Sequence, residues 1–583
     1  MSFATPSHAA WDAFILSRFG DGGRLAKRDA TLTALLDHEL EILQDPRTLA
    51  SARRLRNASS SFACSLPAEV LSRIFWFLQP DWIPSQNWQR GGGGLGWTAV
   101  CHVCSRWREV ALSSSSLWCE IYCYGFPIRS IPAILARSRQ TKLRLFFHGP
   151  DHVDGSPSDD IPGIWICPPV CHRMSELVIV ESKSRFLQTW IPLLRTSMPD
   201  LTRLVFNLTV APLSLDDVLL PLELFNSPQL SIIDVLDCHI PWLSPLPSTA
   251  NLTQLRLQAT HPPQIALRPS FLQLRDVIAR ARALEDLTLC NIFPISHGAP
   301  FGAEYTVPLP DSLISMDLLA RSFEVVNDCL ATLLLLVLPH KSKARVRTEV
   351  CAGAEPSLVS LVMPHFFLAP PDGCLELHVG RRCVVLTLSA MWLAGFSSDG
   401  IEWARHKWAR GERRLHIPGN NENEASRDNT NSLVSYLPLL DMGQVYRLAI
   451  TGDAVLAFQD GKEWMTTFAK AAHVDQLALH FAQNLLPLLC ALAESPPAGP
   501  THEFALFPFL KVIAIFREKD EVGNEVEINH KRSVALQISL TNLVYTRKFA
   551  GRPLQKLRIH CGLLDEDALV LLKEMVDVDI LNS

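Results

Sequence analysis

Apolar residues recur with a fixed spacing over most of the chain, from about residue 170 onward. In each occurrence an apolar residue is followed by others three and five positions later. The last two positions, two residues apart, suit a short strand with one buried face. The twelve triplets are Met174/Leu177/Ile179, Leu201/Leu204/Phe206, Leu230/Ile233/Val235, Leu252/Leu255/Leu257, Leu284/Leu287/Leu289, Leu313/Met316/Leu318, Leu358/Leu361/Met363, Cys383/Leu386/Leu388, Val445/Leu448/Ile450, Val474/Leu477/Leu479, Leu510/Ile513/Ile515 and Leu554/Leu557/Ile559.

This pattern predicts a layered α/β array after about residue 125, with short, largely parallel strands backed by helices such as 271–283 and 463–472. The first six triplets begin 22 to 32 residues apart, close to the period of leucine-rich repeats, and each repeat needs its neighbours to bury its apolar face. Only Cys238 occupies the position where a regular array carries Asn or Cys. The alternative is that an ordinary β/α protein contains some such triplets. We expect the strands to bury Leu204, Leu255, Leu287, Leu448 and Leu557 in a shared core.

The array is predicted to be irregular over 390–440, where the triplets fade. One step between triplets, from 383 to 445, spans 62 residues and contains a polar stretch at 419–432. We expect that stretch to be a mobile loop.

The N-terminal part of the chain has helical rather than strand periodicity. Residues 1–60 carry leucines near a 3.6-residue period, which predicts a helical segment. A stronger helix is predicted over 66–78, with an apolar stripe formed by Leu66, Val70, Ile74 and Leu78 and widened by Leu71 and Phe75. A second helix is predicted near 98–112, followed by Leu117-Trp118 and Ile121. Three short elements cannot bury all these apolar faces alone, so surplus apolar surface is expected.

Composition narrows the class of protein. The 583 residues are 48% hydrophobic and 19% charged, which excludes global disorder. A net charge of −5 gives no basic footprint for nucleic acid or an anionic membrane, and short basic groups such as 341–347 are expected to be solvated. No apolar stretch reaches the ~20 residues that a spanning helix needs, and the N-terminus does not read as a secretory signal. With fifteen cysteines, an odd number, we expect a cytoplasmic or nuclear protein with reduced thiols.

The sequence offers little catalytic or metal-binding chemistry. Gly91–Gly94 is followed by Leu-Gly-Trp rather than by the Lys-Ser/Thr of a phosphate loop. Cys101 and Cys104 form a C-x-x-C pair, and a zinc site would recruit Cys119 and Cys123. Cys104, however, falls on the apolar stripe of the second helix, which favours a core residue. We therefore expect no cofactor and no metal.

The segment 66–121 taken as a whole closely resembles an F-box. The resemblance rests on Leu66-Pro67-x-Glu69-Val70-Leu71-x-x-Ile74-Phe75, on Val103-Cys104-x-x-Trp107-Arg108-x-x-Ala111-Leu112 and on Leu117-Trp118. The surrounding sequence is similar to that of the large F-box families of mushroom-forming fungi. Two features depart from the family pattern: the first loop, 79–96, is long, and Cys101 stands where a polar residue is common.

The resemblance implies a three-helix module that docks on a Skp-type adaptor, which links it to a cullin and a ubiquitin-conjugating enzyme. It places these residues in the module core or on the adaptor face: Leu66, Pro67, Val70, Leu71, Ile74, Phe75, Val103, Cys104, Trp107 and Leu112.

The expected organisation is an N-terminal helical segment at 1–60, an F-box at 61–122 and a leucine-rich-repeat-like region at 123–583. The resemblance implies the substrate-recognition subunit of an SCF-type E3 ubiquitin ligase, which is not itself the catalyst. The repeat region would bind a protein target that the sequence does not identify. Three alternatives stay open: a non-degradative scaffold, a protein-interaction module without a ligase role, and an enzyme within 320–583.

Overall fold

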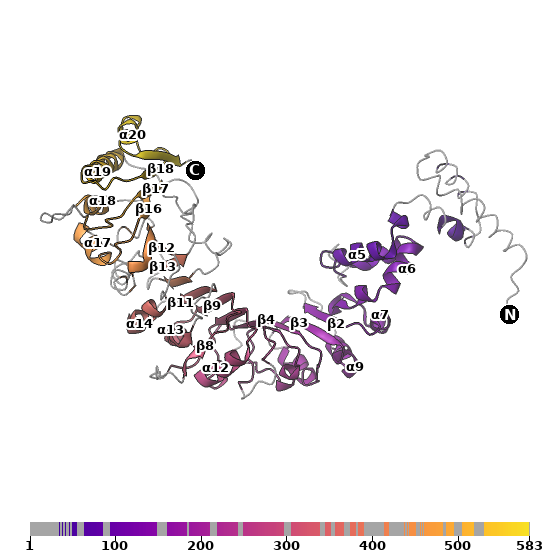
Figure 1. The fold of residues 1–583 in the computed structure, drawn as a ribbon. Coiled ribbons are helices and arrows are strands. Elements are labelled where there is room, and N and C mark those ends of the chain that lie inside the picture. The colour runs from indigo at the N-terminus through magenta and orange to yellow at the C-terminus, as the bar shows by residue number, and fades with distance from the viewer. Residues whose placement is uncertain are drawn as a thin grey trace, which may run out of the picture. The chain divides into compact units, whose positions relative to one another are not determined.

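The fold was analysed in a computed structural model (Figure 1). The structure describes residues 63–84, 94–148, 160–182, 186–209, 218–242, 249–296, 305–337, 344–350, 356–366, 373–380, 383–389, 413–418, 442–450, 460–481, 485–494, 504–517 and 530–581, with 34, 38, 41, 46, 49–54, 437, 440, 455 and 458. The chain divides into two compact units. Unit 1 comprises Met1–Ser214 and Pro221–Gln229, and unit 2 comprises Leu215–Leu220 and Leu230–Ser583. Within the described ranges, no helix is both long and apolar enough to cross a membrane.

Unit 1 contains many short helices. They are η2 (Ala63–Ser65), α5 (Ala68–Leu78), η4 (Gly96–His102), α6 (Ser105–Ser113), η5 (Ser115–Trp118), η6 (Cys123–Gly125), η7 (Ile128–Ser130), α7 (Ile131–Ser138), α8 (Asp160–Trp165), α9 (Pro168–Cys171), η8 (Phe186–Trp190), α11 (Ile191–Leu193) and η9 (Leu222–Asn226). The single helix predicted near 98–112 is wrong, because the chain forms η4 and then α6. Cys104 separates them with an extended backbone, φ −158° and ψ 170°.

Four parallel strands are interleaved with these helices in unit 1: β1 (Glu120–Tyr122), β2 (Leu143–His148), β3 (Met174–Ser182) and β4 (Arg203–Thr209). They pair in the order β1-β2-β3-β4. The register aligns Leu145 with Leu177 and Leu177 with Leu204, and all three side chains are fully buried. The first two triplets therefore mark β3 and β4, as predicted, and all their positions are buried.

Unit 2 contains a longer sheet. Its strands are β5 (Ile232–Leu236), β6 (Gln254–Gln258), β7 (Asp286–Cys290), β9 (Ser315–Ala320), β11 (Arg345–Val350), β12 (Gly373–Gly380), β13 (Cys383–Ser389), β14 (Arg413–Pro418), β15 (Val445–Ile450), β16 (Gln476–Phe481), β17 (Val512–Arg517), β18 (Lys556–His560) and β19 (Asp577–Leu581). A separate parallel pair joins β8 (Val307–Pro308) to β10 (Leu336–Val337). Leu255, Leu287, Leu448 and Leu557 all lie on strands and are at most 1% exposed, so the predicted core positions are confirmed.

Helices back this sheet. They are α12 (Phe271–Arg280), α13 (Val326–Leu335), α14 (Pro356–Phe366), α17 (Gly461–Thr467), α18 (Leu486–Ala493), α19 (His530–Phe549) and α20 (Glu566–Lys573), with 3-10 turns η10 (Ile265–Leu267), η12 (Phe323–Val325) and η15 (Met442–Gln444). In Figure 1, α17, α18 and α19 lie along one side of strands β16 to β18. Both predicted backing helices exist, although α17 covers only the first part of 463–472. Ser270 and Gln273 form a reciprocal capping box at the start of α12.

Two triplets do not lie on parallel strands. Leu358, Leu361 and Met363 belong to α14, in which Val359, Val362 and Met363 are buried and Leu361 is 52% exposed. The prediction of a strand was wrong here, because residues three apart share one face of a helix and three residues is also the first step of a triplet. The triplet at 383–388 lies on β13, which pairs antiparallel with both neighbours.

A meander of three strands, one of which lies in the predicted irregular block 390–440, interrupts the parallel order of the sheet. Strands β12, β13 and β14 lie between β11 and β15 in reverse spatial order, because β11 pairs with β14 and β12 pairs with β15. The insertion accounts for the long step between triplets. The predicted mobile loop at 419–432 lies outside the described residues.

Buried polar side chains close two of the turns. Asn291, fully buried with φ +57°, donates from Nδ2 to Ala259 O (2.8 Å) and Thr260 O (3.1 Å). Its Oδ1 accepts from the backbone amides of Arg321 (2.8 Å) and Ser322 (3.2 Å).

Asp237, with φ +58°, accepts from Thr260 in the neighbouring repeat. The residue whose side chain closes the turn of this repeat is therefore Asp237, one residue before Cys238, where the sequence pattern placed it.

Replacing Asn291 by alanine should destabilise unit 2 by about 2–4 kcal/mol, because four backbone groups lose their bonds to a fully buried side chain. Glycine at the same position removes the same bonds but tolerates the left-handed backbone. The alanine variant should therefore be less stable than the glycine variant by about 1 kcal/mol. Chemical denaturation of both variants measures this difference. Equal stabilities would show that backbone strain at this turn is unimportant.

Candidate docking surface

Helix α5 begins directly after the Leu66-Pro67 pair. Pro67 precedes the first helical residue with φ −54°, and its carbonyl accepts from Leu71 N at 3.1 Å. A proline there suits a helix start, since the first backbone amides have no partner within the helix. Gln79 caps the far end and is 1% exposed. Its Nε2 donates to Leu117 O at 2.7 Å, which ties the end of α5 to η5.

The inner face of α5 forms the core of the module. Leu71 and Phe75 are completely buried, and the Phe75 ring lies 5.1 Å from the Trp107 ring of α6 at an angle of 56°. A second aromatic pair, Trp97 and Trp118, has ring centroids 5.0 Å apart. Trp118 Nε1 donates to Ala111 O at 2.7 Å. These contacts fix α5 against α6 and η5 in one orientation.

The outer face of α5 is apolar and exposed. Val70 is 42% exposed, Ile74 40% and Phe77 58%. These three residues, which we call the docking face, are spaced i, i+4 and i+7 and so lie on one side of the helix. The Arg73 guanidinium lies 4.7 Å from the Trp76 ring centroid and 5.0 Å from that of Phe77, which places a cation beside this face. The fold of the module uses Leu71 and Phe75 and leaves the docking face in solvent.

The structure separates the predicted site residues into three groups. Leu71 and Phe75 are core residues, while Leu66, Cys104, Trp107 and Leu112 are half-buried. The exposed ones are Pro67, Val70, Ile74 and Val103, the last at 60%. The sequence analysis missed Phe77, which is more exposed than Val70 or Ile74. Its position three residues after Ile74 was the available signal.

Cys104 does not lie on an apolar helix stripe, so that prediction was wrong. It is the N-cap residue of α6, and its Sγ accepts from the backbone amide of Trp107 at 3.5 Å. The sulfur also lies 3.6 Å from Cys64 Sγ. The extended backbone at Cys104 points its side chain at the helix start, as an N-cap residue requires.

The four cysteines of the alternative zinc site do not gather as ligands. In the part of the chain that the structure describes, no three His, Cys, Asp or Glu side chains come together in a way that could hold a metal ion. Burial raises the pKa of the Cys101, Cys119 and Cys123 thiols. Thiolate ligands of zinc need the opposite shift.

The long loop after α5 returns to the module at Gly96. This glycine has φ +54°, and a Cβ there would lie 2.4 Å from Pro84 N. The neighbouring Trp97 N donates to Trp82 O at 2.7 Å. The two ends of the loop are thus in contact, and residues 85–93, including Gly91–Gly93, lie outside the described residues.

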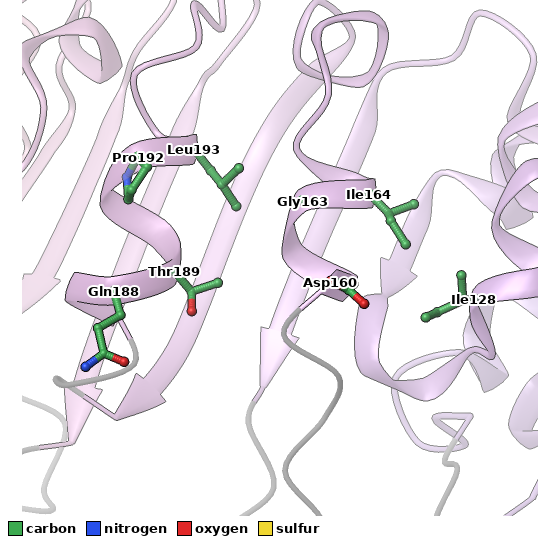
Figure 2. Close-up of a pocket in the computed structure, with 8 residues that line it drawn as sticks. All are labelled: Ile128, Asp160, Gly163, Ile164, Gln188, Thr189, Pro192 and Leu193. Atoms are coloured by element: carbon green, nitrogen blue, oxygen red, sulfur yellow. The ribbon is translucent and has the colours of Figure 1, made fainter.

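A shallow groove of about 660 Å³ lies elsewhere in unit 1 (Figure 2). Its lining comes from η7, α8, η8 and α11: Ile128, Asp160, Gly163, Ile164, Gln188, Thr189, Pro192 and Leu193. Asp160 is the sole ionisable residue of this lining, so the groove lacks a paired acid and base. The groove lies outside 320–583, so it does not test the enzyme alternative for that region.

Two comparisons with known proteins found similarities to this chain. A family model described as F-box-like matches residues 63–124. The leucine-rich repeat-containing protein LegL7 from Legionella pneumophila is a similar solved structure. It is 11% identical, covers 56% of this chain and 84% of its own, and has a TM-score of 0.22. No curated protein matches the chain.

The chain thus carries an F-box-like domain at 63–124, followed by long, largely parallel sheets in a repeat-like arrangement. F-box domains generally bind Skp-type adaptors.

Proposed function

We propose that this protein is the substrate-recognition subunit of an SCF-type E3 ubiquitin ligase. The observation that carries the proposal is the exposed docking face on α5, within the segment that the F-box-like model matches. In this proposal, the F-box recruits a Skp-type adaptor and through it a cullin. The repeat region, from about residue 123, binds a protein target.

The adaptor contact is assigned to Pro67, Val70, Ile74, Phe77 and Val103, which are all exposed. Leu71 and Phe75 in the core, together with the half-buried Trp107, hold these residues in place. Burying an apolar side chain of this size contributes ~1.5–3 kcal/mol, and ~1.4 kcal/mol is a factor of ten in affinity. A few such anchors therefore suffice for a tight interface.

The protein would not be a catalyst, since chains with this combination of domains are typically non-catalytic adaptors. We further propose membership in the F-box families of mushroom-forming fungi, and a cytoplasmic or nuclear location.

Reconstitution tests the ligase role. The full chain is incubated with adaptor, cullin, RING subunit, ubiquitin-activating and ubiquitin-conjugating enzymes, ubiquitin and a captured partner. The proposal expects polyubiquitin on that partner, lost when the docking face is mutated. A partner that binds the complex without receiving ubiquitin would support the scaffold alternative.

A further inference from the structure

The contact between Cys64 and Cys104 joins two segments that carry exposed docking residues. Their sulfurs lie 3.6 Å apart, although the residues are 40 positions apart in the chain. Cys64 belongs to η2, directly before Leu66-Pro67, and Cys104 caps α6 directly after Val103. Both side chains are half-buried and therefore reachable by small oxidants.

We propose that Cys64 and Cys104 are a site of reversible disulfide formation that fixes the start of α5 to the start of α6. An S–S bond is about 2.05 Å long, so the sulfurs need to approach by only about 1.5 Å. In a reducing compartment the two thiols stay reduced, and the bond forms only under oxidative conditions.

The reaction with hydrogen peroxide is balanced. One thiolate attacks a peroxide oxygen, which gives a sulfenic acid and hydroxide. The second thiolate then attacks that sulfur and expels a second hydroxide, and both hydroxides take up protons to leave as water. The two cysteines together lose two electrons, and the peroxide gains them. A small thiol such as glutathione reverses the bond by thiol–disulfide exchange.

The bond should have two effects. It constrains the unfolded chain across the 64–104 segment, which stabilises the module. It also holds Pro67 and Val103 in the relative arrangement seen here, and this second effect rests on the proposed function. These residues then lose less conformational freedom when the adaptor binds, so the complex should dissociate more slowly.

The test uses the full chain treated with hydrogen peroxide and then digested under non-reducing conditions. Mass spectrometry should find the peptides containing Cys64 and Cys104 linked, with the link removed by dithiothreitol. The Cys104→Ser variant keeps a good N-cap residue and should form no such link. Cys101→Ser, which changes a half-buried cysteine three residues away, is the matched control and should form the link normally.

Oxidation should raise the midpoint of thermal unfolding of unit 1 by about 5 °C in wild type and in Cys101→Ser, but not in Cys104→Ser. Adaptor dissociation should slow about threefold in the same two proteins. Absence of the 64–104 link, or a preference for other pairs, overturns the proposed site. A link without slower dissociation overturns the second effect. If even the reduced chain binds no adaptor, the proposed function and that second effect are wrong while the disulfide result stands.

Discussion

Replacing both Val70 and Ile74 by aspartate should abolish adaptor binding without unfolding the protein. Each side chain is about two-fifths exposed and neither belongs to the core around Phe75, so the folded module has room for carboxylates. In the complex, two carboxylates would be buried against apolar adaptor surface without partners. Burying unpaired charge costs several kilocalories per mole, so affinity should fall more than about a hundredfold.

Ile265→Asp provides the matched control for this prediction. Ile265 is 64% exposed and lies in unit 2, outside the F-box-like segment. The Ile265→Asp variant should bind the adaptor as tightly as the wild-type protein does. Surface plasmon resonance measures the affinities, and circular dichroism confirms that each variant is folded. A folded double mutant that binds like the control would show that the docking face is not the contact.

Removing the Phe75 ring should instead destabilise the module itself. Phe75 is completely buried and packs against Trp107. Alanine there loses the transfer free energy of the ring and leaves a cavity, a loss of about 3–5 kcal/mol. That is a large part of the ~5–15 kcal/mol by which a typical domain is stable.

Phe77→Ala separates the two faces of α5, because it removes the same side chain two positions along the same helix. Phe77 is 58% exposed, so its loss should change stability by no more than about 0.5 kcal/mol while weakening adaptor binding. Urea denaturation monitored by tryptophan fluorescence gives the stabilities. Similar losses of stability for both variants would contradict the assignment of inner and outer faces.

The strands were predictable where one face of the sheet is buried. In such strands only every second side chain is buried. Apolar residues such as Leu255 and Leu557 therefore alternate with polar neighbours, and this alternation is visible in the sequence. The prediction failed at Leu358, because a three-residue step is shared by helices and triplets. No triplet marks β2, although it lies within the predicted array and carries the same alternation through Leu143, Leu145 and Phe147.

The docking face could be predicted only in part. Periodicity shows that Val70 and Ile74 share a stripe with Leu66 and Leu78, but it does not show how the helix is rotated against its neighbours. That rotation is set by tertiary contacts such as Phe75 with Trp107. The role of Cys104 was hidden for a similar reason. Its extended backbone, which makes it an N-cap, interrupts a run that looks continuously helical in sequence.

Hydrogen–deuterium exchange of the full chain, with and without a purified Skp-type adaptor, tests the central claim most directly. The account predicts a stable complex in which backbone amides of 66–78 and 101–112 gain protection. The amides of β16 to β18 should exchange at the same rates in both states. No complex, or a complex with protection confined to the repeat strands, would contradict the assignment of α5 as the adaptor-binding helix.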